Sequence, residues 1–179
     1  MEELIQKYKE TLKSLGLDKG PCLTDENGNI LLFGRRWILM DVNAFPEYMI
    51  KSTANIMGER MAKEFIYWFG FAYGDKVMER YLAMGIPEEQ APYVVAAVAS
   101  IVTGWGTPEI LEYNINTGRL VVQIHNDFET ESAKLNNSQP TNNFMRGVLA
   151  GGISRIFGSK VLATANFSDG VTTIVVEKR

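Results

Sequence analysis

The chain is short of the residues that build most metal sites and covalent cross-links. Its 179 residues include one cysteine, Cys22, and one histidine, His125. A single cysteine excludes a disulfide within the chain and any metal cage made of several thiolates. His125 and Asp127 alone are too small a set for a usual metal centre or catalytic constellation, so we expect a solvated strand face at that point.

An excess of positive charge and a long apolar run are also missing. The net charge is −3 and the basic residues are scattered, which gives no footprint for a nucleic acid. The apolar stretches at residues 65–73 and 93–102 are shorter than the roughly 20 residues that cross a bilayer. The first ten residues are charged from the second onward and do not resemble a signal peptide. We therefore expect no nucleic-acid partner, no membrane span and a cytoplasmic location.

Hydrophobic periodicity and turn residues predict helices interspersed with hairpins. The predicted elements are a helix over 2–15, strands over 30–33 and 37–42, two helices over 43–84 that break near Gly58, a helix from Pro87 that ends at Gly104, strands over 109–116 and 119–126, a loop over 127–142, a helix over 142–158, and strands over 161–165 and 171–177. This order predicts an α+β fold, in which an antiparallel sheet built from hairpins packs against helices.

The sequence predicts the register of the hairpin over residues 109–126 and the boundary between an N-terminal segment and the main domain. With Thr117-Gly118 as a two-residue turn, Leu120 lies opposite Ile115 and one face of the hairpin is apolar. We expect residues 1–29 to form an N-terminal helix and first turn, and residues 30–179 to form the main domain. A chain of this length favours a single globular unit.

The stretch FIYWFGFAY, residues 65–73, holds six aromatic side chains in nine positions. A helix that is apolar on every side is buried, and three environments are open to it: a core, a ligand cavity or a subunit interface.

Glycine recurs at four-residue spacing inside two predicted helices. Gly70 and Gly74 lie in the aromatic helix, and Gly147 and Gly151 lie in the helix over 142–158. Each of these glycines costs about 1 kcal/mol of helix stability relative to alanine, so a close backbone approach is expected there. The approach is either a crossing of two helices of one domain or a seam between two subunits. We expect a homodimer, because so much apolar helical surface needs cover.

Five segments, in order, resemble the 4-vinyl reductase domain, also called the hydrocarbon-binding domain, over about residues 30–177. They are GRRWILMDVNAF, FGFAYG, GWGTPEILEYN, GRLVVQIHNDFE and PTNNFMRGVLAGGISRIFGSKV. The resemblance implies an α+β fold that holds a small hydrophobic ligand. It implies kinship with the sensor modules of aromatic-responsive transcription activators, with a factor linked to reducing the 4-vinyl group of chlorophyll precursors, and with vesicle-tethering subunits that hold an acyl chain.

Several members of that family carry a cysteine-based zinc site near the C-terminal strands. In this chain Asn142, Asn166 and Ile174 stand where those members have cysteines, and Ala163 stands where they supply an acid. None of these residues provides the thiolates that zinc prefers. We therefore expect no zinc and no other cofactor.

These patterns favour a protein without catalytic activity that binds or senses a small hydrophobic molecule, whether aromatic, tetrapyrrole or acyl, in an aromatic-lined pocket. Composition, and no matched family motif, selects the candidate pocket residues Trp68, Phe71, Trp105 and Phe144. Two alternatives are a tetrapyrrole 4-vinyl reductase, or its accessory factor, and a dimeric adaptor without ligand. Against the reductase, the sequence has neither a dinucleotide fingerprint nor iron-sulfur cysteines.

Overall fold

The chain divides into two compact units, Met1–Met40 and Asp41–Arg179. The computed structural model describes residues 24–25, 27–32 and 35–178, so the predicted helix over 2–15 lies outside the described residues. In the first unit, β1 (Ile30–Leu32) pairs antiparallel with β2 (Arg35–Trp37). The predicted domain boundary at residue 29 assigns these strands to the main domain, whereas the structure groups them with the N-terminal unit.

The prediction of a strand over 37–42 is wrong, because β2 ends at Trp37. Its partner strand begins at Ile30, directly opposite Trp37, so no further residue of that strand is available for pairing. The residue before Ile30 is held in a turn instead, since Asn29 N donates a hydrogen bond to Asp25 Oδ1 at 2.8 Å.

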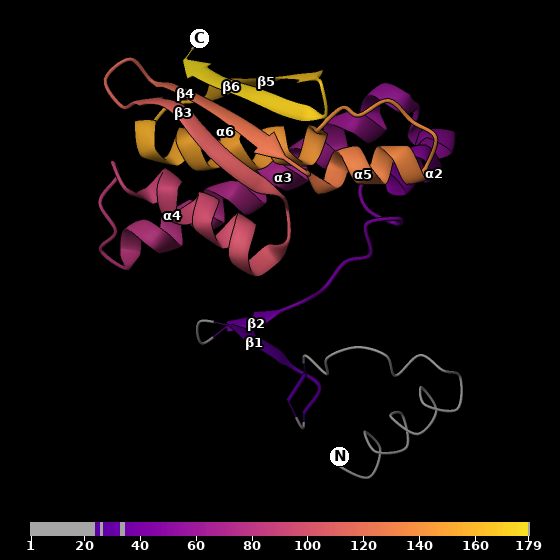
Figure 1. Cartoon of the computed structure of the whole chain (residues 1–179), viewed down its shortest axis with the longest axis horizontal. Helices are drawn as coiled ribbons and strands as arrows, with labels where there is room; N and C mark the ends of the chain where they lie inside the picture. Colours follow the sequence, from indigo (N-terminus) through magenta and orange to yellow (C-terminus); the bar gives the residue numbers. More distant parts are fainter. Residues whose placement is uncertain (1–23, 26, 33–34, 179) are drawn as a thin grey trace. The chain divides into compact units, whose positions relative to one another are not determined.

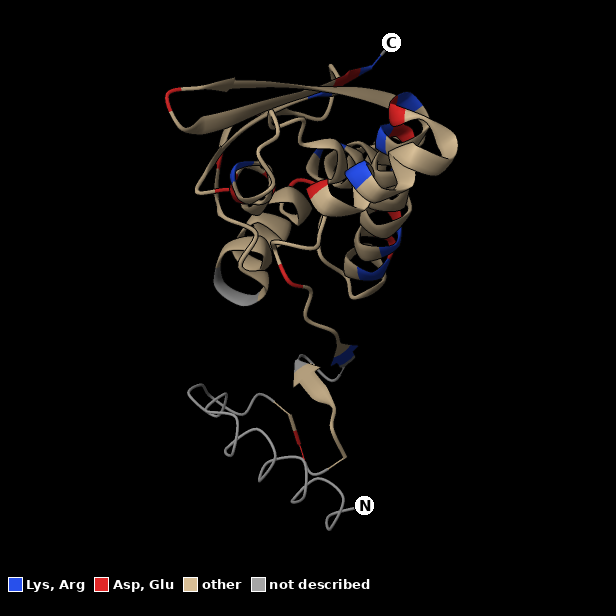
Figure 2. Cartoon of the chain, turned by 90° about the vertical axis from the view of Figure 1, so that its right-hand side faces the viewer, with Lys and Arg blue, Asp and Glu red and all other residues tan. Residues whose placement is uncertain are grey.

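The second unit is an α+β structure with an antiparallel sheet, as predicted, and Figure 1 shows helices packed along the sheet. Its elements are α2 (Glu47–Met57), α3 (Glu59–Ala83), α4 (Ala91–Val98), the π-helical turn η1 (Ala99–Thr103), β3 (Thr107–Asn114), β4 (Arg119–His125), α5 (Phe128–Leu135), α6 (Asn143–Phe157), β5 (Val161–Ser168) and β6 (Val171–Lys178). The strand order is β3-β4-β6-β5, and each neighbouring pair is antiparallel. In Figure 2 acidic and basic residues are spread over the helices of this unit.

Alternation along the central strands decides which face of the sheet is covered. Leu120, Val122 and Ile124 of β4 are buried, whereas the residues between them are partly exposed. β6 repeats this pattern with Thr172, Ile174 and Val176. One apolar face therefore packs on the helices, as the period-two pattern predicts.

The break between α2 and α3 lies at Gly58, as predicted, because this residue has φ +83°, a conformation that favours glycine. The buried face of α3 is a single row of residues four apart. That row is Ala62, Ile66, Gly70, Gly74 and Met78. The expectation that α3 is buried on every side is wrong, because only this row is buried and three neighbouring aromatics stay 43–48% exposed: Phe65, Trp68 and Phe69.

α3 and α6 run side by side in the same direction, and glycines bring their backbones together. A Cβ atom built on Gly74 would lie 2.0 Å from Val148 O, and one on Gly70 would lie 2.3 Å from Phe144 O. The approach is reciprocal, because a Cβ on Gly151 would lie 2.0 Å from Phe71 O. The structure therefore places the glycines of both helices at a crossing within one chain.

Gly147 belongs to the same crossing, where its Cβ would lie 2.1 Å from Tyr67 O. Next along the crossing, Arg155 joins the two helices through Asp75, with Nε donating to Oδ1 at 2.8 Å and Nη2 to Oδ2 at 2.7 Å.

The predicted register of the β3–β4 hairpin is wrong by two residues at its turn. Tyr113, and not Ile115, lies opposite Leu120. The turn is longer than two residues because Asn114 Oδ1 accepts hydrogen bonds from the backbone N–H groups of Asn116 and Thr117. A bulge between Ile110 and Glu112 then shifts the pairing of the rest of β3.

The segment over 127–142 is not only a loop, because α5 occupies Phe128–Leu135. Asp127 caps its N-terminus, and its carboxylate accepts a hydrogen bond from Thr130 N at 2.8 Å. Acidic residues stand in the first turn and Lys134 stands in the last, which suits the helix dipole.

α4 begins at Ala91, four residues after the predicted start at Pro87, with Pro92 in its first turn. The predicted end at Gly104 is confirmed, because Gly104 adopts a left-handed conformation after η1.

Candidate functional site

Phe144, at the start of α6, is the centre of a buried aromatic cluster. Its ring centroid lies 5.1 Å from that of Phe45, 5.4 Å from Trp105 and 6.0 Å from Phe128. Phe128 also stacks on Phe45 at 6.1 Å. Edge-to-face and stacked pairs at these distances stabilise a core beyond the area that they bury. The cluster thus fixes the N-terminal end of α6 against α5 and the segment that leads into β3.

Beside this cluster lies a partly open apolar cavity of about 50 Å³. Residues of α3, α4, η1, the first half of β3, β4 and α6 line it. Met78 of α3, Val95 of α4, Trp105, Val122 of β4 and Met145 of α6 are among the residues that form its wall. All of its lining residues are aliphatic, aromatic, proline, methionine or glycine. The wall therefore presents no acid, base or nucleophile to a molecule inside.

The size of the cavity bounds what fits without movement. A cavity of about 150 Å³ lined by apolar side chains holds benzene, whereas a single water needs about 10–15 Å³. The present 50 Å³ lies between these values. Met78 and Met145 line the cavity, and methionine side chains adapt to irregular spaces because they are unbranched. The cavity in its present shape is therefore smaller than a space that holds a ring, and Met78 and Met145 are the lining side chains best able to adapt.

The structure does not bring the four candidate pocket residues together. Trp105 lines the cavity, and Phe144 contacts Trp105 from the aromatic cluster without lining the cavity itself. Trp68 and Phe71 pair with each other at 5.2 Å elsewhere on α3. Trp68 is 48% exposed, and Lys160 Nζ lies 5.9 Å from its ring centroid.

Sequence reasoning missed the aliphatic residues that make most of the wall. Val95 and Ala99 follow one another at helical spacing in the segment YVVAAVASIV, which the sequence marks as apolar. That pattern is equally typical of ordinary core packing, so it could not identify a cavity. The same holds for Val148 and Gly152 of α6.

Glu129 of α5 is fully buried and ties α5 to the N-terminus of α6. Its carboxyl group accepts hydrogen bonds from Met145 N at 2.6 Å and from Phe144 N at 3.2 Å. Burial raises the pKa of Glu129 to about 8, although the two backbone hydrogen bonds act in the opposite direction. This carboxyl group therefore holds in place the two residues that connect the cavity wall to the aromatic cluster.

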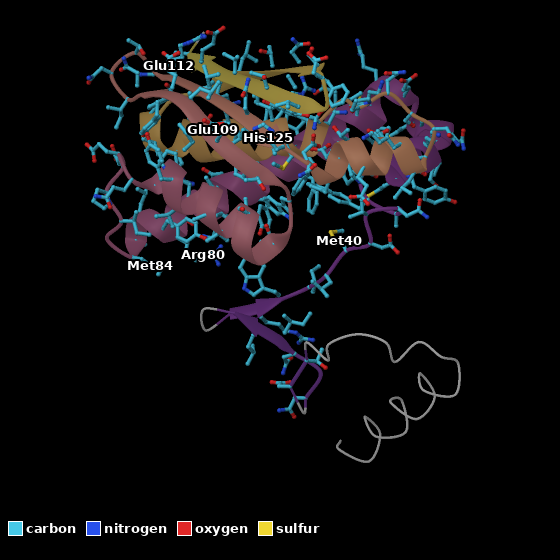
Figure 3. The ribbon with its side chains drawn as sticks, viewed as in Figure 1. Met40, Arg80, Met84, Glu109, Glu112 and His125 are labelled. Atoms are coloured by element: carbon cyan, nitrogen blue, oxygen red, sulfur yellow. The ribbon has the colours of Figure 1, made fainter. Side chains whose placement is uncertain are left out.

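Asp127 has a structural role that accounts for its position beside His125. Besides capping α5, its carboxylate accepts hydrogen bonds from the hydroxyl groups of Thr130 and Thr172 and from Asn142 Nδ2, all within 2.9 Å. His125 points away from this network, on the outer face of the sheet beside Glu109 (Figure 3). The two residues do not form a joint site.

The four positions that the predicted resemblance aligns with a zinc site do not converge on one point. Asn142 is buried and bound to Asp127. Ala163 and Ile174 lie on the covered face of the sheet, whereas Asn166 lies on the outer face. Within residues 24–25, 27–32 and 35–178, no group of three or more histidine, cysteine or acidic side chains could hold a metal ion.

No protein family model matches the chain. No curated protein sequence matches it either. Among solved structures, the chain is similar to the phenol-responsive sensory domain of the transcription activator PoxR, determined with phenol. The TM-score is 0.72 and the identity 18%, over 95% of this chain and 89% of that one. This likeness shows that the two share a fold.

Two weaker structural likenesses have TM-scores below 0.5. One is to trafficking protein particle complex subunit 3 from Naegleria fowleri, covalently bound to palmitic acid, with 9% identity, a TM-score of 0.46, and coverage of 74% of this chain and 94% of that one. The other is to an H-NOX mutant, with 12% identity, a TM-score of 0.49, and coverage of 94% and 84%. Among the described helices, none combines the length and the apolar character that a bilayer crossing requires.

Proposed function

We propose that the unit Asp41–Arg179 binds a small hydrophobic molecule in the apolar cavity and acts as a binding or sensing module of the hydrocarbon-binding (4-vinyl reductase) type. The observation that carries this proposal is the cavity wall, which is apolar throughout. A concave apolar site next to a cluster of packed aromatic rings is typical of small-molecule binding. The fold shared with a sensory domain that was determined with phenol supports the same function.

The chemistry of the wall favours an uncharged aromatic molecule over the tetrapyrrole and acyl alternatives. The indole N–H of Trp105 is the one side-chain donor among the lining residues. A carboxylate on a fatty acid or a tetrapyrrole would be buried without a charged partner, which costs several kcal/mol or more. A tetrapyrrole also exceeds a cavity of about 50 Å³ by far. A single ring with at most one hydroxyl group therefore fits best.

The same wall favours binding over catalysis. General acid–base and nucleophilic mechanisms need a titratable or nucleophilic side chain within hydrogen-bonding reach of the substrate. The lining residues supply none. We further propose that the family's zinc site is lost here, since Asn142, Ala163, Asn166 and Ile174 offer no thiolate and do not converge.

The test is a thermal-shift and NMR titration of the full chain with toluene, phenol and benzoate. We expect toluene and phenol to raise the melting temperature and to shift methyl resonances of Met78 and Met145, because binding to the folded state stabilises it. Benzoate, which has the ring but carries a charge, should not bind. If neither uncharged probe binds at millimolar concentration, the proposed function is wrong.

A pair of variants locates the site. Val95→Ala removes two methyl groups from the cavity wall, whereas Val94→Ala makes the same change at the neighbouring position, which does not line the cavity. We expect Val95→Ala to bind toluene more tightly than the wild type, because the ring then displaces fewer side chains. Val94→Ala should bind as the wild type does. Equal effects of the two changes would place the ligand elsewhere.

A further inference from the structure

The two outer strands of the sheet differ in how their free edges are protected. β3 carries Pro108, Glu109 and Glu112, and a bulge between Ile110 and Glu112 interrupts its pairing. Proline, charge and bulges are the devices that natural proteins use to keep an exposed edge from pairing with another chain. The β3 edge is therefore blunted.

β5 has none of these devices. Its eight residues, VLATANFS, contain no charge and no proline, and its register with β6 is unbroken from Val161 to Ser168. Leu162 and Phe167 are 39% and 38% exposed. Within the described part of the chain no strand pairs with its outer edge. A long, regular and uncharged edge is a ready template for a further strand.

The residues at the two ends of β5 indicate which strand pairs with its free edge. Lys160 precedes the strand and Asp169 follows it, and both are exposed. When two copies of β5 pair antiparallel, the lysine end of each meets the aspartate end of the other. Parallel pairing would place like charges together instead, which is destabilising. The edge is thus complementary to itself in one orientation only.

The alternation of the strand limits the possible registers, and the residues at its ends favour one of them. A two-fold axis perpendicular to the sheet keeps the covered and outer faces of the two copies continuous, so only residues of one face can lie opposite each other. An axis at Thr164 places Val161 opposite the partner's Phe167 and Lys160 opposite the partner's Ser168, next to the partner's Asp169. An axis one residue later would place Val161 opposite the partner's Asp169, an apolar side chain against a charge.

We propose that β5 is a dimerisation edge, at which two copies of this chain join their four-stranded sheets into one eight-stranded antiparallel sheet centred on Thr164. In this dimer the strand edge joins the two copies, and the glycines of α3 and α6 pack within one copy. Such an interface is small, so we expect a dissociation constant in about the micromolar range.

Sedimentation equilibrium of the full chain over a range of concentrations tests the proposal. Thr164→Lys places two lysines opposite each other at the axis and should weaken the dimer about tenfold or more. The matched control is Thr107→Lys, the same change on the exposed face of β3, which should leave the dimer unchanged. Circular dichroism confirms that both variants fold.

A charge-exchange pair identifies the occupant as a second copy. Lys160→Glu faces the partner's Ser168 and Asp169, and Ser168→Lys faces the partner's Lys160, so each variant alone should be weakened as a dimer. An equimolar mixture should form a heterodimer, because the new glutamate then faces the new lysine.

A wild-type chain that stays monomeric at about 100 µM, well above the expected micromolar constant, would overturn the proposal. The proposal would also be wrong if Lys160→Glu and Ser168→Lys were each monomeric and stayed monomeric when mixed. That result would mean that the natural occupant of the edge is the strand of another protein and not a second copy of β5. The toluene titration is read separately, because the cavity and the β5 edge share no residue.

Discussion

The adjacent glycines of α6 allow a sharp test of the α3–α6 crossing. Gly151→Ala would place a methyl group 2.0 Å from Phe71 O and 2.9 Å from Asp75 N, both backbone atoms that cannot rotate away. Gly152→Ala would place the same group 3.4 Å from Met78 Cε, in ordinary contact with the end of a flexible side chain. The two changes have the same chemistry, lie in the same helix and are both buried.

Their expected effects on the free energy of unfolding have opposite signs. To restore a contact of 3.4 Å at Gly151, the helices must separate by about 1.4 Å, the difference between 3.4 and 2.0 Å. Overpacking typically costs 1–3 kcal/mol, and the upper end applies because the obstacle is backbone. Alanine returns about 1 kcal/mol of helix propensity. Gly151→Ala should therefore lower stability by about 2 kcal/mol, and Gly152→Ala should raise it by up to about 1 kcal/mol.

Urea denaturation followed by tryptophan fluorescence measures both values. We expect a difference of about 3 kcal/mol in the free energy of unfolding between two variants that helix propensity alone would treat as equal. If the free energy of unfolding of Gly151→Ala lies within about 0.5 kcal/mol of the wild-type value, the close approach of the two backbones is refuted.

Three further predictions concern the buried acids and the ion pair between α3 and α6. The raised pKa of Glu129 means that the folded state holds a proton that the unfolded state releases between pH 4.5 and about 8. The free energy of unfolding should therefore fall as pH rises through this window, by up to about 1.4 kcal/mol per pH unit. Urea denaturation at several pH values measures this dependence, and a Glu129→Gln variant whose free energy of unfolding depends on pH as the wild type's does would contradict the prediction. Asp127→Ala removes a helix cap and the acceptor of three further side-chain hydrogen bonds, so it should lower the denaturation midpoint by the equivalent of about 3 kcal/mol; a loss below about 1 kcal/mol would show that the donors find other partners. Arg155→Ala breaks a partly exposed pair with Asp75 and should cost at most about 1 kcal/mol, with less effect in high salt; a larger, salt-independent loss in the same assay would assign Arg155 a packing role.

The fold class, the order of the major elements and the break at Gly58 could be predicted because local signals carry them. Period-two alternation marks β4 and β6, and glycine marks the helix ends. α5 had local signals as well, namely a cap at Asp127 and acids in its first turn. Its polar composition concealed them, since Glu129 counts as a surface residue until its partners at the start of α6 are known.

The site was harder to predict, because its walls come from several distant segments. The aromatic composition of α3 drew attention to Trp68 and Phe71, but the small residues of the row through Gly70 and Gly74 decide which face is buried. Off that row, Phe65 and Trp68 are about half exposed. Phe69 and Tyr73 instead contact Phe144 of the buried cluster, at 5.8 and 6.1 Å. The cluster also includes Phe45 and Phe128, whose separation from Phe144 along the chain gives no local signal of contact.

The glycine crossing also bears on how relatives of this chain can be found. Most buried positions accept several hydrophobic residues, so distant relatives diverge there without losing the fold. The four crossing positions are different, because at each of them even a methyl group would lie within 2.3 Å of a backbone oxygen of the facing helix. A sequence search can give extra weight to these four glycines, which form one pair four residues apart in each of the two parallel helices. Such a search should therefore find chains of the same fold that overall sequence identity misses.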